Sequence, residues 1–252
     1  FIVRFIFDEL GIEIEEPETD YLDELLKNFK GAFPKTTVFS EYARKTMPEK
    51  ISPIEAPDET LMAWMSHEER LFRRLERHIV SKRLMDGFVD GEDTDVDGFI
   101  KISLSIQNRR KSRVGYAFEN HMQKIFELNQ IQYSRGKITE NKSKPDFLFP
   151  SIEAYHNERF PTSLLTMLGA KTTCKDRWRQ VLPEASRIKN KHLVTIEPGI
   201  SENQTNEMQA HLLQLVVPKL IIPTYNNNQK KWLMDLESFV KMVSLKQSKT
   251  YQ

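Results

Sequence analysis

The chain has 252 residues, of which 39% are hydrophobic and 29% are charged, and its formal net charge is +1. A chain of this length can form one large domain, or a core with a smaller appendage, and can bury a substantial interior. Its composition is ordinary for a soluble protein, and no run of about eighteen apolar residues is present, which excludes a membrane span. The total charge is too close to neutral to indicate a nucleic-acid partner by itself.

Cys174 is the only cysteine. A single cysteine excludes an internal disulfide framework and fits a reducing compartment, so we expect a cytoplasmic protein. The chain begins with Phe1 and shows no basic segment followed by a signal-type apolar segment. We therefore expect an excised or trimmed piece of a longer protein.

The first hundred residues have apolar positions at helical spacing. This pattern predicts two short amphipathic helices, at 20–29 and 37–44, and a long helix at 59–82. Three prolines mark a linker before the long helix, namely Pro48, Pro53 and Pro57. Residues 86–98 are acidic and contain glycine, which indicates a loop.

After residue 104 the pattern changes to alternating strands and helices, which predicts an α/β core. Strands are expected at 131–133, 146–150, 164–171, 192–196 and 215–218. Helices are expected at 116–128, 175–182 and 201–212, the last with Ser201 as N-cap. Pro183 must kink the second of these helices or open a new one. We thus predict a mostly helical N-terminal subdomain, residues 1–104, that supports dimerisation and DNA contacts, followed by a core of residues 105–252.

Two carboxylates and a lysine stand at places suited to phosphodiester chemistry. Asp146 opens a strand directly after Pro145, Lys171 ends an apolar strand, and Glu184 follows the helix kink. Mg²⁺ prefers one or two carboxylates together with water and phosphate oxygens, and an ammonium group can stabilise charge growing on phosphorus. Each residue alone also fits a solvated surface position, so the prediction rests on the set.

Basic residues cluster in two segments. Lys175, Asp176 and Arg177 combine donors for guanine O6 and N7 with an acceptor for cytosine N4, which predicts reading of G·C pairs. The alternative is an ordinary helix N-terminus. A second cluster is expected to hold DNA phosphates and consists of Arg109, Arg110, Lys111 and Arg113. A solvated helix face is the alternative there.

Three longer stretches carry a family resemblance: residues 144–150, residues 168–180 and residues 112–121. Together they resemble the PD-(D/E)XK restriction nucleases, and in particular the EcoRII-type catalytic domain of the branch that reads CCNGG or CCWGG sites. The likeness covers residues 105–225 well and the first hundred residues less distinctively. It implies the restriction-endonuclease fold, a mixed sheet flanked by helices.

The chain departs from the general superfamily pattern at Gly169, where an acid usually stands two residues before the lysine. The resemblance implies that Glu184 supplies the missing acid. Asp146 and Glu184 are then the expected metal ligands and Lys171 the catalytic lysine. Glu119, on the preceding helix, and Tyr155 are second-tier candidates, and Glu119 fits a helix surface equally well.

The resemblance further implies a type II restriction endonuclease that uses Mg²⁺ to cut double-stranded DNA at a CCWGG-like site and leaves 5′-phosphate ends. A near-palindromic site requires a homodimer, and the family implies a cognate DNA methyltransferase in the same cell. Flipping of the central bases is expected, with loose candidates for its pocket in Arg70, Arg73 and Arg74. As an isolated catalytic piece, the chain is expected to cut a lone site.

Two other functions stay open. The chain could be a DNA-binding module that has lost catalysis, which would bind DNA without cutting it. It could also be a repair or structure-selective nuclease of the same fold, because fold alone does not settle function. The triplet at 175–177 argues against the second of these.

Overall fold

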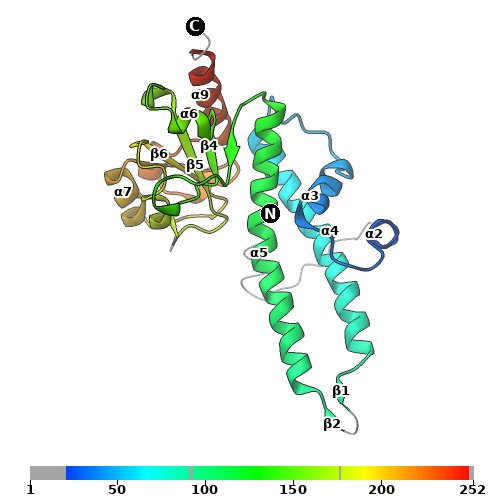
Figure 1. Ribbon diagram of the computed structural model, residues 1–252. Helices are drawn as coiled ribbons and strands as arrows, with labels where there is room; N and C mark the ends of the chain where they lie inside the picture. Colours follow the sequence, from blue (N-terminus) through cyan, green and yellow to red (C-terminus); the bar gives the residue numbers. More distant parts are fainter. Residues whose placement is uncertain (1–20, 91–92, 176, 250–252) are drawn as a thin grey trace. The chain divides into compact units, whose positions relative to one another are not determined.

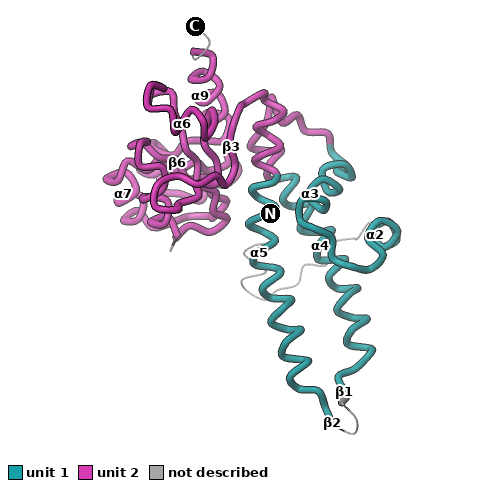
Figure 2. The backbone as a smooth tube through the Cα atoms, in the orientation of Figure 1, with its two compact units in different colours: residues 1–49, 63–120 teal, residues 50–62, 121–252 magenta. Residues whose placement is uncertain are grey.

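The computed structural model describes residues 21–90, 93–175 and 177–249. It divides into two compact units (Figure 2): unit 1 takes residues up to 49 and residues 63–120, and unit 2 takes residues 50–62 and those from 121 onward. The expected division at residue 104 stays a prediction about domain organisation. None of the helices in the described ranges is long and apolar enough to cross a membrane.

Unit 1 is helical, as the apolar spacing predicted. It contains α2 (Leu22–Phe29), α3 (Thr36–Lys45) and most of α4 (Pro57–Met85) and α5 (Val96–Leu128). Helices α2, α3 and α4 each have an apolar face, and burying these faces together removes them from water. The resulting core cluster consists of Leu25, Phe39, Ala43, Leu71, Phe72 and Leu75.

The connection between the two long helices differs from the expected acidic loop. Two short antiparallel strands, β1 (Val89–Asp90) and β2 (Asp93–Thr94), pair there. Helix α5 then starts at Val96 rather than at residue 116, with the Asp95 carboxylate accepting the Gly98 N–H at 2.8 Å. The first half of α5 is largely exposed, so its sequence lacks the apolar stripe by which a helix is recognised.

Unit 2 is built on a five-stranded mixed sheet in the order β3-β4-β5-β6-β7. Strands β4, β5 and β6 are labelled in Figure 1. The strands are β3 (Ser134–Arg135), β4 (Phe147–Phe149), β5 (Thr166–Ala170), β6 (Lys191–Val194) and β7 (Leu213–Val216). Pairing is antiparallel from β3 to β5 and parallel from β5 to β7. The predicted mixed sheet flanked by helices is therefore confirmed.

Helices complete unit 2. They are α6 (Ile152–His156), α7 (Glu202–Ala210), α8 (Asn227–Lys230) and α9 (Leu236–Ser248). The predicted cap of α7 is confirmed, because the Ser201 hydroxyl accepts the Gln204 N–H. A buried aromatic cluster joins the end of α5 to the sheet and to α9, with ring centroids 5.1 Å apart for Phe126 and Phe149 and 5.8 Å apart for Phe149 and Phe239.

Two predicted elements of unit 2 were wrong. The strand expected at 131–133 is displaced to β3, because the side chain of Gln247 donates to the Gln132 carbonyl and accepts its N–H instead of a strand partner. The helix expected at 175–182 is only the 3₁₀ helix η3 (Trp178–Val181). Pro183 has no N–H to extend it, and Glu184 N bonds to the Val181 carbonyl in a turn.

Candidate active site

Asp146 and Lys171 come together at one edge of the sheet. Asp146 directly precedes β4 and Lys171 directly follows β5, and these antiparallel strands bring the start of one beside the end of the other. Lys171 Nζ lies 2.7 Å from Asp146 Oδ2, and the Ala170 N–H donates to the same oxygen at 2.6 Å. The side chain of Lys171 is 13% exposed and that of Asp146 is 15% exposed, so the ion pair is largely shielded from solvent.

Glu184 belongs to the same charge cluster. Burial raises the pKa of its carboxyl to about 7, and the negative charge of Asp146 adds to this rise, while Lys171 and Lys191 oppose it. Within the described residues, Glu184 Oε2 is buried without a hydrogen-bond partner. A buried acid held beside another acid is poorly stabilised as an anion unless a cation joins it.

This arrangement fits a divalent cation. The described residues contain no group of three or more His, Cys, Asp or Glu side chains that could hold a metal ion. Mg²⁺ does not require such a cage, because it commonly takes one or two carboxylates and fills its remaining positions with water and phosphate oxygens. The unpartnered oxygen of Glu184, in the field of Asp146, is the observation that makes these two acids suitable ligands.

Gly169 shows why no acid stands on strand β5. A Cβ atom at this position would lie 2.9 Å from Val181 Cγ2 and 3.2 Å from its Cγ1. Leu193 on the neighbouring strand would also be in contact, at 3.5 Å. The β-branched Val181 has few alternative rotamers, so the position has no room for a side chain.

Tyr155 is buried next to the site but already has a partner. Its hydroxyl contacts both carboxylate oxygens of Glu140, at 2.5 and 2.7 Å, and Glu140 also accepts the Ser186 N–H at 3.3 Å. Burial and the Glu140 carboxylate raise the pKa of Tyr155 to about 12. Tyr155 thus holds the Glu140 carboxylate in place. Glu140 in turn holds Ser186, which belongs to the turn that carries Glu184.

Lys191 and Arg187 support the same turn, and sequence reasoning missed both, as it missed Glu140. Buried Lys191 Nζ donates to the Ala185 carbonyl at 3.2 Å and to the Ile188 carbonyl at 2.5 Å. Burial lowers the pKa of Lys191, while the charges of Glu140 and Glu184 act in the opposite direction. The Arg187 guanidinium donates to the carbonyls of Tyr155, Asn157 and Phe160. Their acceptors are backbone atoms, so no residue pattern revealed them.

The predicted base-reading residues lie on an exposed segment. Lys175 and Arg177 are exposed, whereas the flanking Cys174 and Trp178 are fully buried. Asp176 lies outside the described residues. The cations thus project from a backbone whose ends are anchored in the interior.

The remaining candidates lie on α5 in unit 1, where Glu119 is partly buried. Arg109 and Lys111 are exposed, and the Arg109 guanidinium lies 4.3 Å from the centroid of the Phe33 ring. Arg110 pairs with Glu76, their nearest atoms 2.6 Å apart. Arg113 is buried, so phosphate contact would require it to leave its internal partners. These are the carboxylates of Glu68 and Glu69 and the ring of Phe72.

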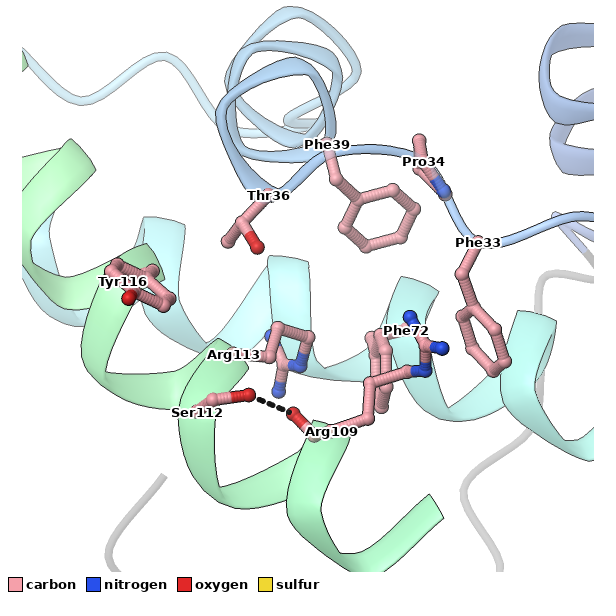
Figure 3. Close-up of a pocket in the computed structure, with 9 residues that line it drawn as sticks. All are labelled: Phe33, Pro34, Thr36, Phe39, Phe72, Arg109, Ser112, Arg113 and Tyr116. Atoms are coloured by element: carbon pink, nitrogen blue, oxygen red, sulfur yellow. Dashed lines mark hydrogen bonds between the residues drawn. The ribbon is translucent and has the colours of Figure 1, made fainter. Parts of the chain in front are cut away.

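A cavity of about 130 Å³ lies in unit 1 beside these arginines (Figure 3). Among the residues that line it, the Arg109 guanidinium lies against the ring of Phe33 and the Arg113 guanidinium against the ring of Phe72, at 4.3 and 4.1 Å from the ring centroids. Of the loosely proposed α4 arginines, Arg73 pairs with Glu69 at 2.7 Å, and none of the three lines this cavity.

Comparisons with known proteins agree with the predicted family. A family model described as EcoRII C terminal matches residues 72–240. The chain is 36% identical over 231 residues to the type II restriction enzyme EcoRII of Escherichia coli, which covers 91% of the chain and 55% of EcoRII. It is 29% identical over 119 residues to the type II restriction enzyme SsoII of Shigella sonnei, covering 42% of the chain and 37% of SsoII. The chain therefore spans little more than half the length of the first relative.

Solved structures show the same fold. Metal-depleted Ecl18kI in complex with uncleaved DNA superposes with a TM-score of 0.70 at 19% identity, covering 87% of this chain and 81% of Ecl18kI. The PspGI–substrate DNA complex superposes with a TM-score of 0.66 at 16% identity, covering 94% of this chain and 98% of PspGI. At these identities the likeness concerns the fold.

Proposed function

Because the chain belongs to the EcoRII C-terminal family, we propose that it is the catalytic part of a type II restriction endonuclease that hydrolyses double-stranded DNA at a CCWGG-like site. The observation that carries this proposal is the convergence of Asp146, Lys171 and Glu184 at one sheet edge. The relatives' names support a nuclease, and the site supplies the groups that cutting a phosphodiester requires.

Asp146 and Glu184 would hold Mg²⁺, which when bound supplies positive charge to the phosphate. Lys171 adds an ammonium group, and its hydrogen bond to Asp146 fixes where that charge sits. Water attacks phosphorus, the bond to the 3′ oxygen breaks and this oxygen takes up a proton, which leaves 5′-phosphate and 3′-hydroxyl ends. The protein contributes mainly placement and charge stabilisation to this reaction.

Lys175, Asp176 and Arg177 would read one half-site in the major groove, with the cations on guanine and the acid on cytosine. Changing Arg177 to Ala should cost about 1–3 kcal/mol of base discrimination if the contact is bidentate. If the protein binds cognate and scrambled duplexes equally well both before and after this change, Arg177 is not a base-reading residue.

A palindromic site with an odd central pair calls for two identical readers, so we propose a homodimer that flips the central bases. Unit 1 would support dimerisation and DNA contact, with Arg110 and Lys111 on phosphates. The cavity of Figure 3 combines rings with guanidinium groups, which stack on bases, and is a better candidate for a flipped base than Arg70, Arg73 and Arg74. 2-Aminopurine at the central position should brighten on binding, and less so with Arg109→Ala.

In the cell, such an enzyme would act in the cytoplasm together with a DNA methyltransferase that protects the host's own sites.

The decisive experiment is digestion of plasmids that carry no, one or two CCWGG sites, with and without Mg²⁺, followed by sequencing of the fragment ends. We expect Mg²⁺-dependent cuts confined to the site, with 5′-phosphates. Binding without any cut in the presence of Mg²⁺ would indicate an inactive DNA-binding module. Cuts that ignore sequence but follow mismatches or branches would indicate a structure-selective nuclease.

A further inference from the structure

Glu197 is a buried acid that the proposed reaction does not use. It follows strand β6 and is only 7% exposed. Its Oε2 atom accepts the N–H groups of Cys174 at 2.5 Å and Lys175 at 2.9 Å. Its other oxygen lies 3.6 Å from Lys175 Nζ. One carboxylate therefore holds the peptide N–H groups of two successive residues at the start of the base-reading segment, by which we mean the predicted base-reading residues 175–177.

Other contacts fix Glu197 itself. Its N–H donates to the Thr195 hydroxyl at 3.1 Å, and this hydroxyl donates to the Thr172 carbonyl at 3.3 Å. The Tyr225 hydroxyl donates to the Glu197 carbonyl at 2.8 Å. The backbone of Glu197 is thus fixed by Tyr225 and, through Thr195, by the residues just before the segment that it holds.

The base-reading segment is anchored from its far side as well. Gln204 Nε2 donates to the Lys175 carbonyl at 2.9 Å, and the N–H groups of Arg177 and Trp178 both donate to the Cys174 carbonyl at 2.9 Å. Trp178 is fully buried. Lys175 and Arg177 nevertheless remain exposed. The backbone at Lys175 and at Arg177 is held by hydrogen bonds, whereas the side chains of these two residues are accessible.

Burying a carboxylate costs free energy unless hydrogen bonds or a cation compensate. Two charge-assisted bonds to backbone N–H groups recover much of that cost and set the local chain direction. Bidentate contacts to a base edge tolerate little displacement, so a fixed backbone preserves discrimination between bases. Phosphate contacts are less demanding, because they depend mainly on charge.

We propose that Glu197 is a positioning residue for sequence reading, which fixes the peptide groups of Cys174 and Lys175 so that Lys175 and Arg177 meet the base edges in register. This role rests on the proposed function. Loss of the Glu197 carboxylate should weaken binding to the cognate site. It should leave binding to unrelated DNA nearly unchanged, because the exposed cations Lys175 and Arg177 remain.

The test measures dissociation constants without metal for three duplexes: one with CCWGG, one with a single outer G·C pair changed, and one unrelated. Glu197→Ala should lower the ratio of unrelated to cognate dissociation constants about tenfold or more, and Glu197→Gln should lower it less because its amide oxygen still accepts an N–H. Glu158→Ala removes an exposed acid of the same unit and is the control for charge. Circular dichroism and thermal unfolding identify variants that retain the fold.

A folded Glu197 variant with unchanged selectivity overturns this role. Equal weakening on all three duplexes also overturns it, because that is the result of a general structural defect. If Glu197→Ala does not fold, the comparison of Glu197→Gln with the unmodified protein decides by the same criteria. An unmodified protein without preference for CCWGG refutes the proposed function, and this role with it. A selective protein whose folded Glu197 variants stay equally selective refutes the role alone.

Discussion

Lys171 and Asp146 form an ion pair of 2.7 Å across the antiparallel strands β4 and β5, with side chains 13% and 15% exposed. A pair so well shielded from water holds its ammonium in one place. The lysine therefore brings a fixed positive charge to the edge of the sheet, where it interacts electrostatically with Glu184.

Replacing Lys171 with Ala should reduce cleavage by about 100-fold or more, because a fixed charge aimed at a developing negative charge is worth that much in comparable sites. Binding to the cognate duplex should change little. Single-turnover cleavage with Mg²⁺ and gel-shift titration measure the two quantities. Lys189→Ala, an exposed lysine of the same unit, is the matched control. Cleavage within a few-fold of normal would remove Lys171 from the reaction.

Replacing Glu184 with Gln should stabilise the metal-free protein and abolish its response to Mg²⁺. Burial and Asp146 raise the pKa of Glu184 from 4.5 to about 7, so the fold loses stability as the pH rises from about 4.5, and the loss is complete somewhat above 7. At pH 8 the variant should gain roughly 1–2 kcal/mol, after allowance for its partial exposure. Thermal unfolding with and without Mg²⁺ tests both effects. A variant as responsive to Mg²⁺ as the unmodified protein contradicts the assignment.

Tyr155→Phe and Glu140→Gln should have similar, non-additive effects. Tyr155→Phe removes, and Glu140→Gln weakens, the hydrogen bond between the tyrosine hydroxyl and the carboxylate, worth about 1–3 kcal/mol when one partner is charged. Tyr155→Phe also removes the acceptor of the Arg187 N–H, at 3.3 Å. A double-mutant cycle on unfolding free energy should give a coupling of that size. If Tyr155→Phe alone loses cleavage with little loss of stability, the hydroxyl acts on substrate instead.

The contribution of two buried histidines to stability should fall as the pH drops below about 6.5. Burial lowers the pKa of His192 and of His67 to about 4 from the ordinary 6.5, so the unfolded chain takes up protons that the folded protein excludes. The loss begins near 6.5 and is complete near 4. Each histidine contributes roughly 2–3 kcal/mol at most. Urea unfolding between pH 5 and 7 gives the free energy of unfolding at each pH. This free energy should change less with pH for His192→Gln than for the unmodified protein, whereas the exposed control His156→Gln should keep the original pH dependence. If His192→Gln has the same pH dependence of unfolding free energy as the unmodified protein, His192 does not contribute to it.

Much of the fold was predictable because its signals are local. The strands that carry Asp146 and Lys171 are short apolar runs next to punctuating residues, and Ser201 marks the start of its helix. The length of α5 was not predictable from hydrophobic spacing, because its first half is exposed and lacks an apolar stripe. The helix expected at 175–182 is only the short 3₁₀ helix η3, which Pro183 cannot extend because it has no N–H.

The candidate site was predictable only in part, and for a related reason. Asp146, Lys171 and Glu184 belong to a motif of residue types, which a sequence displays. Arg187 and Lys191 donate to backbone carbonyl groups, and Glu140 accepts a backbone N–H as well as the Tyr155 hydroxyl; every residue except proline carries both backbone groups. Their partners are therefore visible only when the chain is folded.

Val181 fills the volume that a side chain at position 169 would need, because its Cγ2 atom would lie only 2.9 Å from a Cβ atom there. An acid returned to the strand would therefore meet this valine before it could reach a metal ion. Placing an acid on strand β5 therefore requires that Val181 shift or be replaced by a smaller residue. A single substitution at position 169 is thus not enough to move the acid from the turn to the strand.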